Sequence, residues 1–193
     1  MAIAKARELV EWTAQALYDL ELPGTTRTRI AATCFGVAQE HHHAIVVLLE
    51  ANLKSSAFAL VRAVYEAYVR GLWLAHCAND AELEAFSTGT EPPKMDTLLS
   101  AIERTEVFAG GELSEIKTHN WRSMCDYAHS GSRQVQRWNT SDIITPNHSV
   151  EEIDEILGFT NTFALLSAVS VAALANNEVL ARRLLEKSQE YAV

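Results

Sequence analysis

The chain has 193 residues, of which 48% are hydrophobic and 21% are charged, and it contains only 8 Gly and 4 Pro. A chain of this length buries roughly 70% of its unfolded surface, so it can fold as one domain without metal or disulfide staples. The small share of Gly and Pro favours long helices over a β-sandwich or a disordered tail. A formal net charge of −9 argues against a protein that coats nucleic acid through a bulk positive field, so any nucleic-acid contact must be local.

Apolar residues recur at helical spacing along most of the chain. The spacing predicts helices over residues 2–20, 26–53, 56–78, 80–86, 96–108, 114–130 and 149–175, with a last helix ending near 190. A serine is expected to cap the third helix, and Ser149 with Glu152 fits a capping box. The third helix is apolar almost all the way round, which is typical of a helix enclosed by its neighbours. We therefore expect a single all-α domain over 1–193, an antiparallel bundle of about six or seven helices with this one near its centre.

The segment 132–148 has only a weak hydrophobic pattern, and a short strand near Ile143 remains one alternative there.

Three cysteines, Cys34, Cys77 and Cys125, lie far apart without a Cys-x-x-Cys pair, which indicates neither a zinc site nor a disulfide framework. No signal peptide or membrane-spanning segment is expected, because charged residues interrupt the N-terminus and the longest apolar run is short. A reducing cytoplasm is the simplest location.

The segment 120–131 contains the residues best suited to chemistry. Arg122 and His129 are seven residues apart, so on a helix both leave nearly the same face, roughly 10 Å apart along the axis. A guanidinium that binds phosphate beside an imidazole that moves protons could cleave a phosphodiester without metal, with the RNA 2′-hydroxyl as nucleophile. The alternative is a solvated polar stripe, in which Asp126 forms an intrahelical ion pair with Arg122.

Arg122, the polar Ser123 and His129 resemble the motif of HEPN (higher eukaryote and prokaryote nucleotide-binding) domains, in which Arg is followed by a polar residue and then, after four to six intervening residues, by His. The stretches 62–66 and 127–131 are also similar to uncharacterised bacterial helical proteins related to that clan. Those domains are helical bundles, and many resemble toxin or anti-phage endoribonucleases with composite sites formed across a dimer.

The resemblance implies a metal-independent RNA-binding protein or endoribonuclease that acts as a homodimer, without cofactor, with an antitoxin-type protein as a further partner. Arg122 would stabilise phosphate charge and His129 would transfer protons. The motif of active members usually opens the last major helix, whereas here it lies near a helix end. A non-catalytic bundle that binds a small ligand or a protein partner therefore stays open.

Arg62, Glu66 and Arg70 follow one another at intervals of four on the most enclosed helix. Buried charges need partners, so a structural Arg-Glu-Arg ladder is one interpretation. The functional alternative has Arg62 or Glu66 contact Arg122 or His129 from the neighbouring helix and orient the site.

Other residues are expected to support the motif or to offer a different chemistry. Asp126 and Tyr127 would assist Arg122 and His129, and Arg133 and Arg137 would add local positive potential for RNA. Glu40 and His43 have the Glu-x-x-His spacing of di-iron bundles, and Asp126 with His129 could supply a second copy. Helix phase turns Glu40 and His43 away from the core, so no metal ligands are predicted, and His42 is expected to be buried and bonded to a neighbour.

Overall fold

The computed structural model describes residues 2–139 and 142–191, in which every regular element is helical. The helices are α1 Ala2–Leu17, α2 Thr26–Glu50, α3 Lys54–His76, α4 Asp80–Ser87, α5 Met95–Ile102, α6 Glu112–Ala128, α7 Ser132–Gln136, α8 Val150–Leu174 and α9 Glu178–Ser188, with a 3₁₀ turn, η1, at Glu106–Phe108. The expected all-α class is confirmed. These described residues form nine α-helices rather than six or seven, because α4, α5 and α7 are short and the helix expected over 96–108 divides into α5 and η1.

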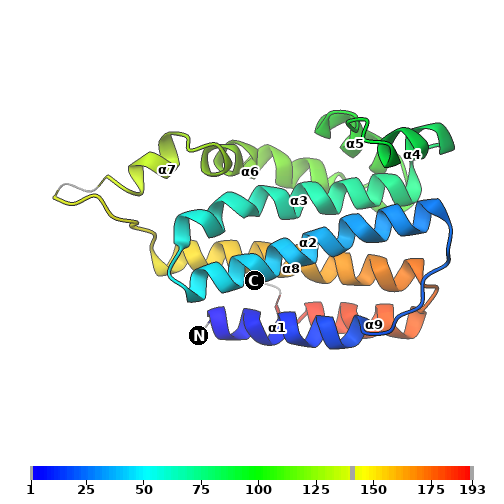
Figure 1. Cartoon of the computed structure of the whole chain (residues 1–193), viewed down its shortest axis with the longest axis horizontal. Coiled ribbons are helices and arrows are strands. Elements are labelled where there is room, and N and C mark those ends of the chain that lie inside the picture. The colour runs from blue at the N-terminus through cyan, green and yellow to red at the C-terminus, as the bar shows by residue number, and fades with distance from the viewer. Residues whose placement is uncertain (1, 140–141, 192–193) are drawn as a thin grey trace.

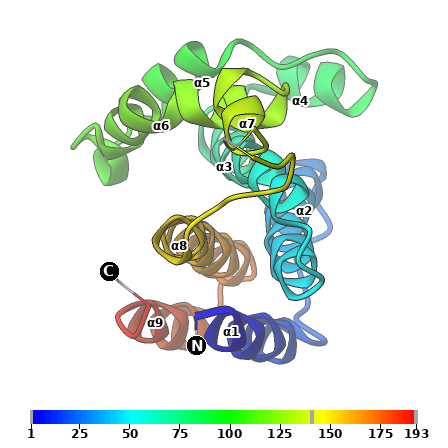
Figure 2. The same cartoon turned by 90° about the vertical axis from the view of Figure 1, so that its left-hand side faces the viewer.

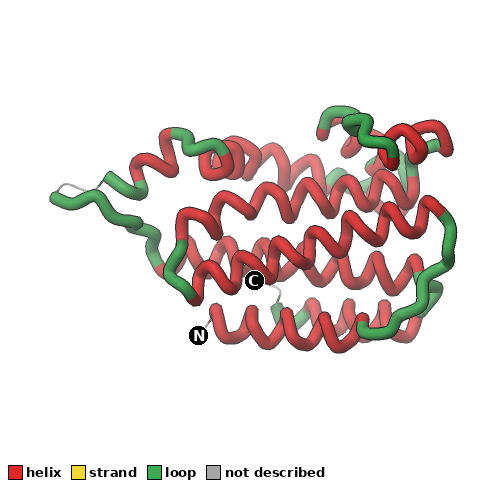
Figure 3. The backbone as a smooth tube through the Cα atoms, viewed as in Figure 1, coloured by secondary structure: helices red, strands yellow, loops and turns green. Residues whose placement is uncertain are grey.

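The long helices form stacked layers around α3 and α8 (Figures 1 and 2). α1 and α9 lie side by side on one outer face, α2 and α8 lie above them, and α3 carries α4 to α7 on the opposite face. Figure 3 shows that loops and turns join the helices without any strand in the described chain. An isolated antiparallel bridge joins Asn139 and Ile144. It lies in the segment for which the sequence left a short strand as an alternative.

α3 is the central helix, as its apolar sequence predicts. Twelve of its residues are buried, and it packs against α2, α5, α6 and α8. Gly71 allows α3 to approach α2 closely, since an added Cβ would lie 2.6 Å from Cε1 of Phe35. The hydroxyl of Tyr65 donates to the Leu113 carbonyl at 2.7 Å and so joins α3 to α6. The first turn of α6 is therefore fixed against the centre of the fold.

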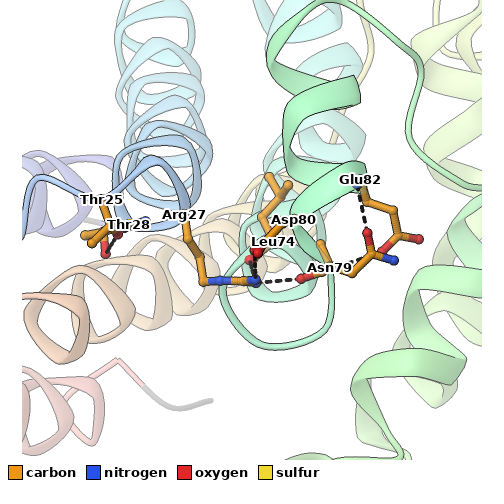
Figure 4. A network of polar contacts seen from close by, with 8 residues as sticks. Thr25, Arg27, Thr28, Leu74, Asn79, Asp80 and Glu82 are labelled. Carbon is orange, nitrogen blue, oxygen red and sulfur yellow. Dashed lines mark hydrogen bonds and ion pairs between the residues drawn. The ribbon is translucent and has the colours of Figure 1, made fainter.

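The first turn of α2 is tied to the C-terminal end of α3 by one arginine (Figure 4). Arg27 Nη1 donates to the carbonyls of Leu74 and Ala78 at 3.0 and 2.7 Å, and its Nη2 lies 3.5 Å from Asp80. The last carbonyls of a helix lack N–H donors from a following turn, so Arg27 supplies donors to them. Its positive charge is also favourable at the negative end of the helix dipole. Arg27 thereby fixes the α2–α3 pair at the end remote from α7.

The starts of α3 and α8 show one wrong and one confirmed prediction. α3 begins at Lys54 without a side-chain cap, so no serine caps it; Ser55 Oγ instead accepts from Trp138 Nε1 at 2.5 Å. Ser149 and Glu152 form the predicted capping box at α8. α8 is long and apolar enough to cross a membrane, but half of that apolar stretch is buried inside the fold, as is usual for a core helix.

Candidate functional site

The C-terminal end of α6 brings the candidate residues together with α3 and α7. The helix ends at Ala128, and Ser130 adopts a left-handed conformation with φ of 54°. The Gly131 N–H donates to the Asp126 carbonyl at 2.6 Å, which is the closing bond of a Schellman motif. A Cβ at residue 131 would lie 2.6 Å from Asp126 Oδ1, so glycine fits this close turn. The turn leads into α7, which packs against the end of α6.

Arg62 of α3 is the most heavily bonded cation near this end. Its Nε donates to Glu66 Oε1 at 2.7 Å, and Glu66 Oε2 accepts from Arg70 at 3.1 Å. Its guanidinium lies 4.6 Å from the ring centroid of Trp121 on α6, and its Nη1 lies 2.7 Å from His129 Nε2. The Arg-Glu-Arg ladder and the expected contact between α3 and the motif are therefore both present.

The bond between Arg62 and His129 assigns roles to the two imidazole nitrogens. A guanidinium has only donors, so His129 Nε2 accepts in this bond. Because His129 is exposed at the surface, Nδ1 can reach solvent or a ligand. An imidazole oriented in this way can accept a proton at Nε2 if Arg62 releases it.

Arg62 also borders a cleft of about 600 Å³ between α3, α6 and the loop that leads into α5. Trp121 and Lys117 contribute from α6, and Lys94 contributes from the loop. The Lys117 ammonium lies 5.0 Å from the Trp121 centroid and 2.7 Å from Asp96. Neither Trp121 nor Lys117 was assigned a role from the sequence; the spacing of four between them on α6 was the available signal.

A second and more polar cleft, of about 330 Å³, lies between α6 and α7. Arg122, Arg133 and Arg137 line it together with Asp126, Tyr127, Ser132 and Gln136, and we call it the arginine cleft. Arg133 lies 3.8 Å from Asp126, and Arg137 pairs with Glu152 at the start of α8. Arg122 is exposed and has no hydrogen bond or ion pair with any described residue. It is thus the arginine best placed to accept an external anion.

The arginine cleft does not include His129. Counting residues predicts a common face for Arg122 and His129, but His129 has left the helical conformation, with φ of −114°, and bonds Arg62 of α3. Arg122 instead faces α7. Asp126 likewise pairs with Arg133 rather than with Arg122, because the turn at 130–131 returns α7 to its side. Within one chain, Arg122 and His129 therefore occupy neighbouring but separate environments.

Tyr127 joins the arginine cleft to the apolar interior. Its ring meets that of Phe58 edge to face at 4.9 Å and lies 6.2 Å from the ring of His148. His148 is buried, and neither ring nitrogen has a partner among the described residues. Burial lowers the pKa of His148, so the neutral ring is favoured. The contact with Phe58 thus holds the Tyr127 ring in place, and this ring forms part of the wall of the arginine cleft.

The residues of the di-iron alternative have other partners. His43 Nε2 accepts from Arg7 at 2.9 Å, and His129 is bound to Arg62. Across residues 2–139 and 142–191, no three His, Cys, Asp or Glu side chains are grouped closely enough to hold a metal. His42 is buried, as predicted, and its Nε2 bonds Asn161 Oδ1 at 2.7 Å. It stabilises the contact between α2 and α8.

Comparison with known proteins gives one match. No curated protein and no solved structure matches the chain significantly. Residues 35–193, which include α3, α6, α7 and every residue of both clefts, match a family described as a family of unknown function, DUF6988. The match spans most of the chain, and the protein accordingly belongs to the DUF6988 family.

Proposed function

We propose that the protein binds RNA through phosphate contacts in the arginine cleft. The observation that carries the proposal is Arg122, an exposed guanidinium that no described residue pairs, in a cleft with two more arginines. Guanidinium groups bind phosphate oxygens in a bidentate manner, with short charge-assisted hydrogen bonds. Ser132 and Gln136 add neutral donors on the same wall.

Single-stranded RNA is the form that suits this site. The cleft is small and lies at a helix end, so it can hold one or two phosphates but cannot follow a duplex backbone. The clan resemblance of Arg122, Ser123 and His129 independently suggests RNA. The net charge of −9 fits this proposal only if binding is local, since the rest of the surface repels a polyanion.

Fluorescence anisotropy with an end-labelled 20-nucleotide single-stranded RNA tests the proposal. We expect Arg122→Ala to raise Kd on the order of tenfold, the loss typical of one charge-assisted contact. Arg182→Ala is the matched control, because Arg182 is an exposed arginine on α9, on the opposite face of the bundle. Equal affinity of the wild type and Arg122→Ala would refute the proposal, and so would equal weakening by both substitutions.

Cleavage of the bound RNA is a second candidate function, favoured by the contact that orients the His129 imidazole against Arg62. A phosphate that binds Arg62 would compete for Nη1 and free His129 Nε2. His129 would then take the proton of a 2′-hydroxyl as its oxygen attacks phosphorus, and would return that proton to the departing 5′-oxygen. The products would be a 2′,3′-cyclic phosphate and a 5′-hydroxyl. Because Arg122 and His129 are separated within one chain, this reaction favours a homodimer in which the two groups come from different copies.

Product analysis separates cleavage from binding alone. Labelled RNA is incubated with excess EDTA, and the fragments are tested for a cyclic phosphate end. Wild-type cleavage that His129→Ala abolishes, without a change in RNA Kd, would support the reaction. Binding without cleavage would leave the protein as an RNA-binding bundle, and cleavage retained by His129→Ala would exclude the imidazole as the base.

A further inference from the structure

An apolar groove runs along α8 on the side that faces α6 and η1. Its main part has a volume of about 920 Å³ and is lined chiefly by α6, α8 and η1. It shares Phe159 with a smaller cavity that reaches Ile156, and it shares Val107 and Phe108 with a third cavity that reaches Leu174. The three cavities follow one another along α8, and we call them together the α8 groove.

The α8 groove exists because α6 and α8 both pack on α3 and have little contact with each other. Figure 2 shows α6 and α8 as separate rods with α3 beside both. Buried side chains of Tyr68, Leu113 and Phe163 form part of its lining. Two helices held apart over an apolar floor leave a space of the kind that a further helix fills in a bundle.

The edge of the α8 groove exposes more apolar surface than this fold needs. Val107 in η1 is 84% exposed and borders two of the three cavities. Phe159, Leu166 and Val169 of α8 are only partly buried along the same line. A contiguous apolar patch of this kind is costly in water and marks an interaction surface.

Carboxylates border the middle and the α8 N-terminal end of the α8 groove. Glu112 lies on the α6 side, and Glu151, Asp154 and Glu155 lie on the α8 side. Among the described residues, Arg133 is the only arginine or lysine that lines the main part of the groove or the smaller cavity. An occupant must therefore present cations beside its apolar face. A second copy in symmetric contact would instead bring like charges together, at a cost in affinity.

The length of the groove sets the size of the occupant. The apolar lining on α8 extends from Ile156 to Leu174, over which the helix rises roughly 27 Å at 1.5 Å per residue, the length of a helix of about 18 residues. We propose that the α8 groove binds an amphipathic helix of a partner protein, with apolar residues at i, i+3 or i+4 and i+7 and with Lys or Arg on both flanks. This proposal does not rest on the proposed RNA binding, although Tyr127 and Arg133 line both the smaller cavity and the arginine cleft.

A designed peptide pair tests the charge and the apolar requirement together. The probe is a fluorescein-labelled 18-residue Leu/Lys amphipathic helix, the Lys peptide. The comparison peptide, the Glu peptide, has Glu in place of every Lys. We expect the Lys peptide to bind and the Glu peptide to bind at least tenfold more weakly. Val107→Asp should raise the Kd of the Lys peptide at least tenfold. Because Val107 is 84% exposed, this substitution does not disturb the core.

Matched controls separate the groove from the general acidity of the chain. Val179→Asp on α9 changes a side chain that is 82% exposed, away from the groove, and should leave Kd unchanged. Asp154→Lys should weaken the Lys peptide, whereas Glu178→Lys on α9 should not. Equal effects of Val107→Asp and Val179→Asp, or equal binding of both peptides, would overturn the proposal. A dimer in light scattering that Val107→Asp dissociates would also overturn it, because a second copy would then fill the groove.

Discussion

The buried contact between His42 and Asn161 makes a quantitative prediction about acid stability. His42 is 1% exposed, and burial lowers its pKa to about 4, from an ordinary value of 6.5. The hydrogen bond to Asn161 opposes this shift but does not cancel it. Between pH 6.5 and pH 4 the unfolded chain therefore binds a proton at His42 that the folded chain does not. The free energy of unfolding must fall as the pH is lowered through this window.

The size of the effect follows from the two pKa values. One pKa unit is worth about 1.4 kcal/mol, so the full window is worth about 3 kcal/mol, and about 2 kcal/mol is lost between pH 7 and pH 5. His42→Gln removes the titrating group and retains an amide that can reach Asn161. We expect the free energy of unfolding of this variant to fall by about 2 kcal/mol less than that of the wild type over the same interval.

Urea unfolding followed by circular dichroism, at half-unit steps from pH 7 to pH 5, measures the difference directly. The matched control is His119→Gln, because the His119 ring is exposed and bonds only the Glu115 carbonyl of its own helix. Carboxylates titrate in both proteins, so only the difference between variant and wild type counts. If His42→Gln loses stability with the same pH slope as the wild type, the buried neutral histidine does not account for acid sensitivity.

Two further substitutions test how the helices are held. Gly71→Ala should lower the free energy of unfolding by about 1–3 kcal/mol through overpacking, because its Cβ meets the Phe35 ring, whereas Gly24→Ala meets nothing within 4 Å and should be tolerated. Urea midpoints of the two variants measure this, and equal midpoints would show that Phe35 moves aside freely. Ser149→Ala should cost about 1 kcal/mol through loss of the α8 cap, and Ser149→Asp should restore it. Thermal unfolding of both proteins decides this, since a cap with no stabilising role would leave them equal.

Regular periodicity was sufficient to predict the long helices and their buried faces. The enclosed α3, the capping box at Ser149 and the buried His42 all follow from local rules that tertiary packing reinforces. The helix expected over 96–108 is wrong in its second half, where the chain turns at residues 103–105 and continues as η1. Val107 lies in this turn and is exposed.

The candidate site was harder to predict because it depends on one turn. Helical counting placed Arg122 and His129 on a common face, but the left-handed conformation at Ser130 ends the helix before His129 can share that face. The same turn gives Asp126 a partner in Arg133 that no local pairing rule supplies. The α8 groove also has no local signal, since an apolar helix does not reveal which of its faces a neighbour covers.

The charges of the arginine cleft limit how RNA can bind. Arg133 already lies near Asp126 and Arg137 already pairs with Glu152, so Arg122 supplies most of the uncompensated positive charge. A protein that neutralises one or two phosphates of a single strand has a salt slope of roughly −0.7 to −1.4, because each contact contributes about −0.7. Binding by a bulk positive surface would give a much steeper slope. Anisotropy titrations at several salt concentrations should therefore show a shallow slope that Arg122→Ala flattens by about 0.7, and a steep slope that survives this substitution would place the contact elsewhere.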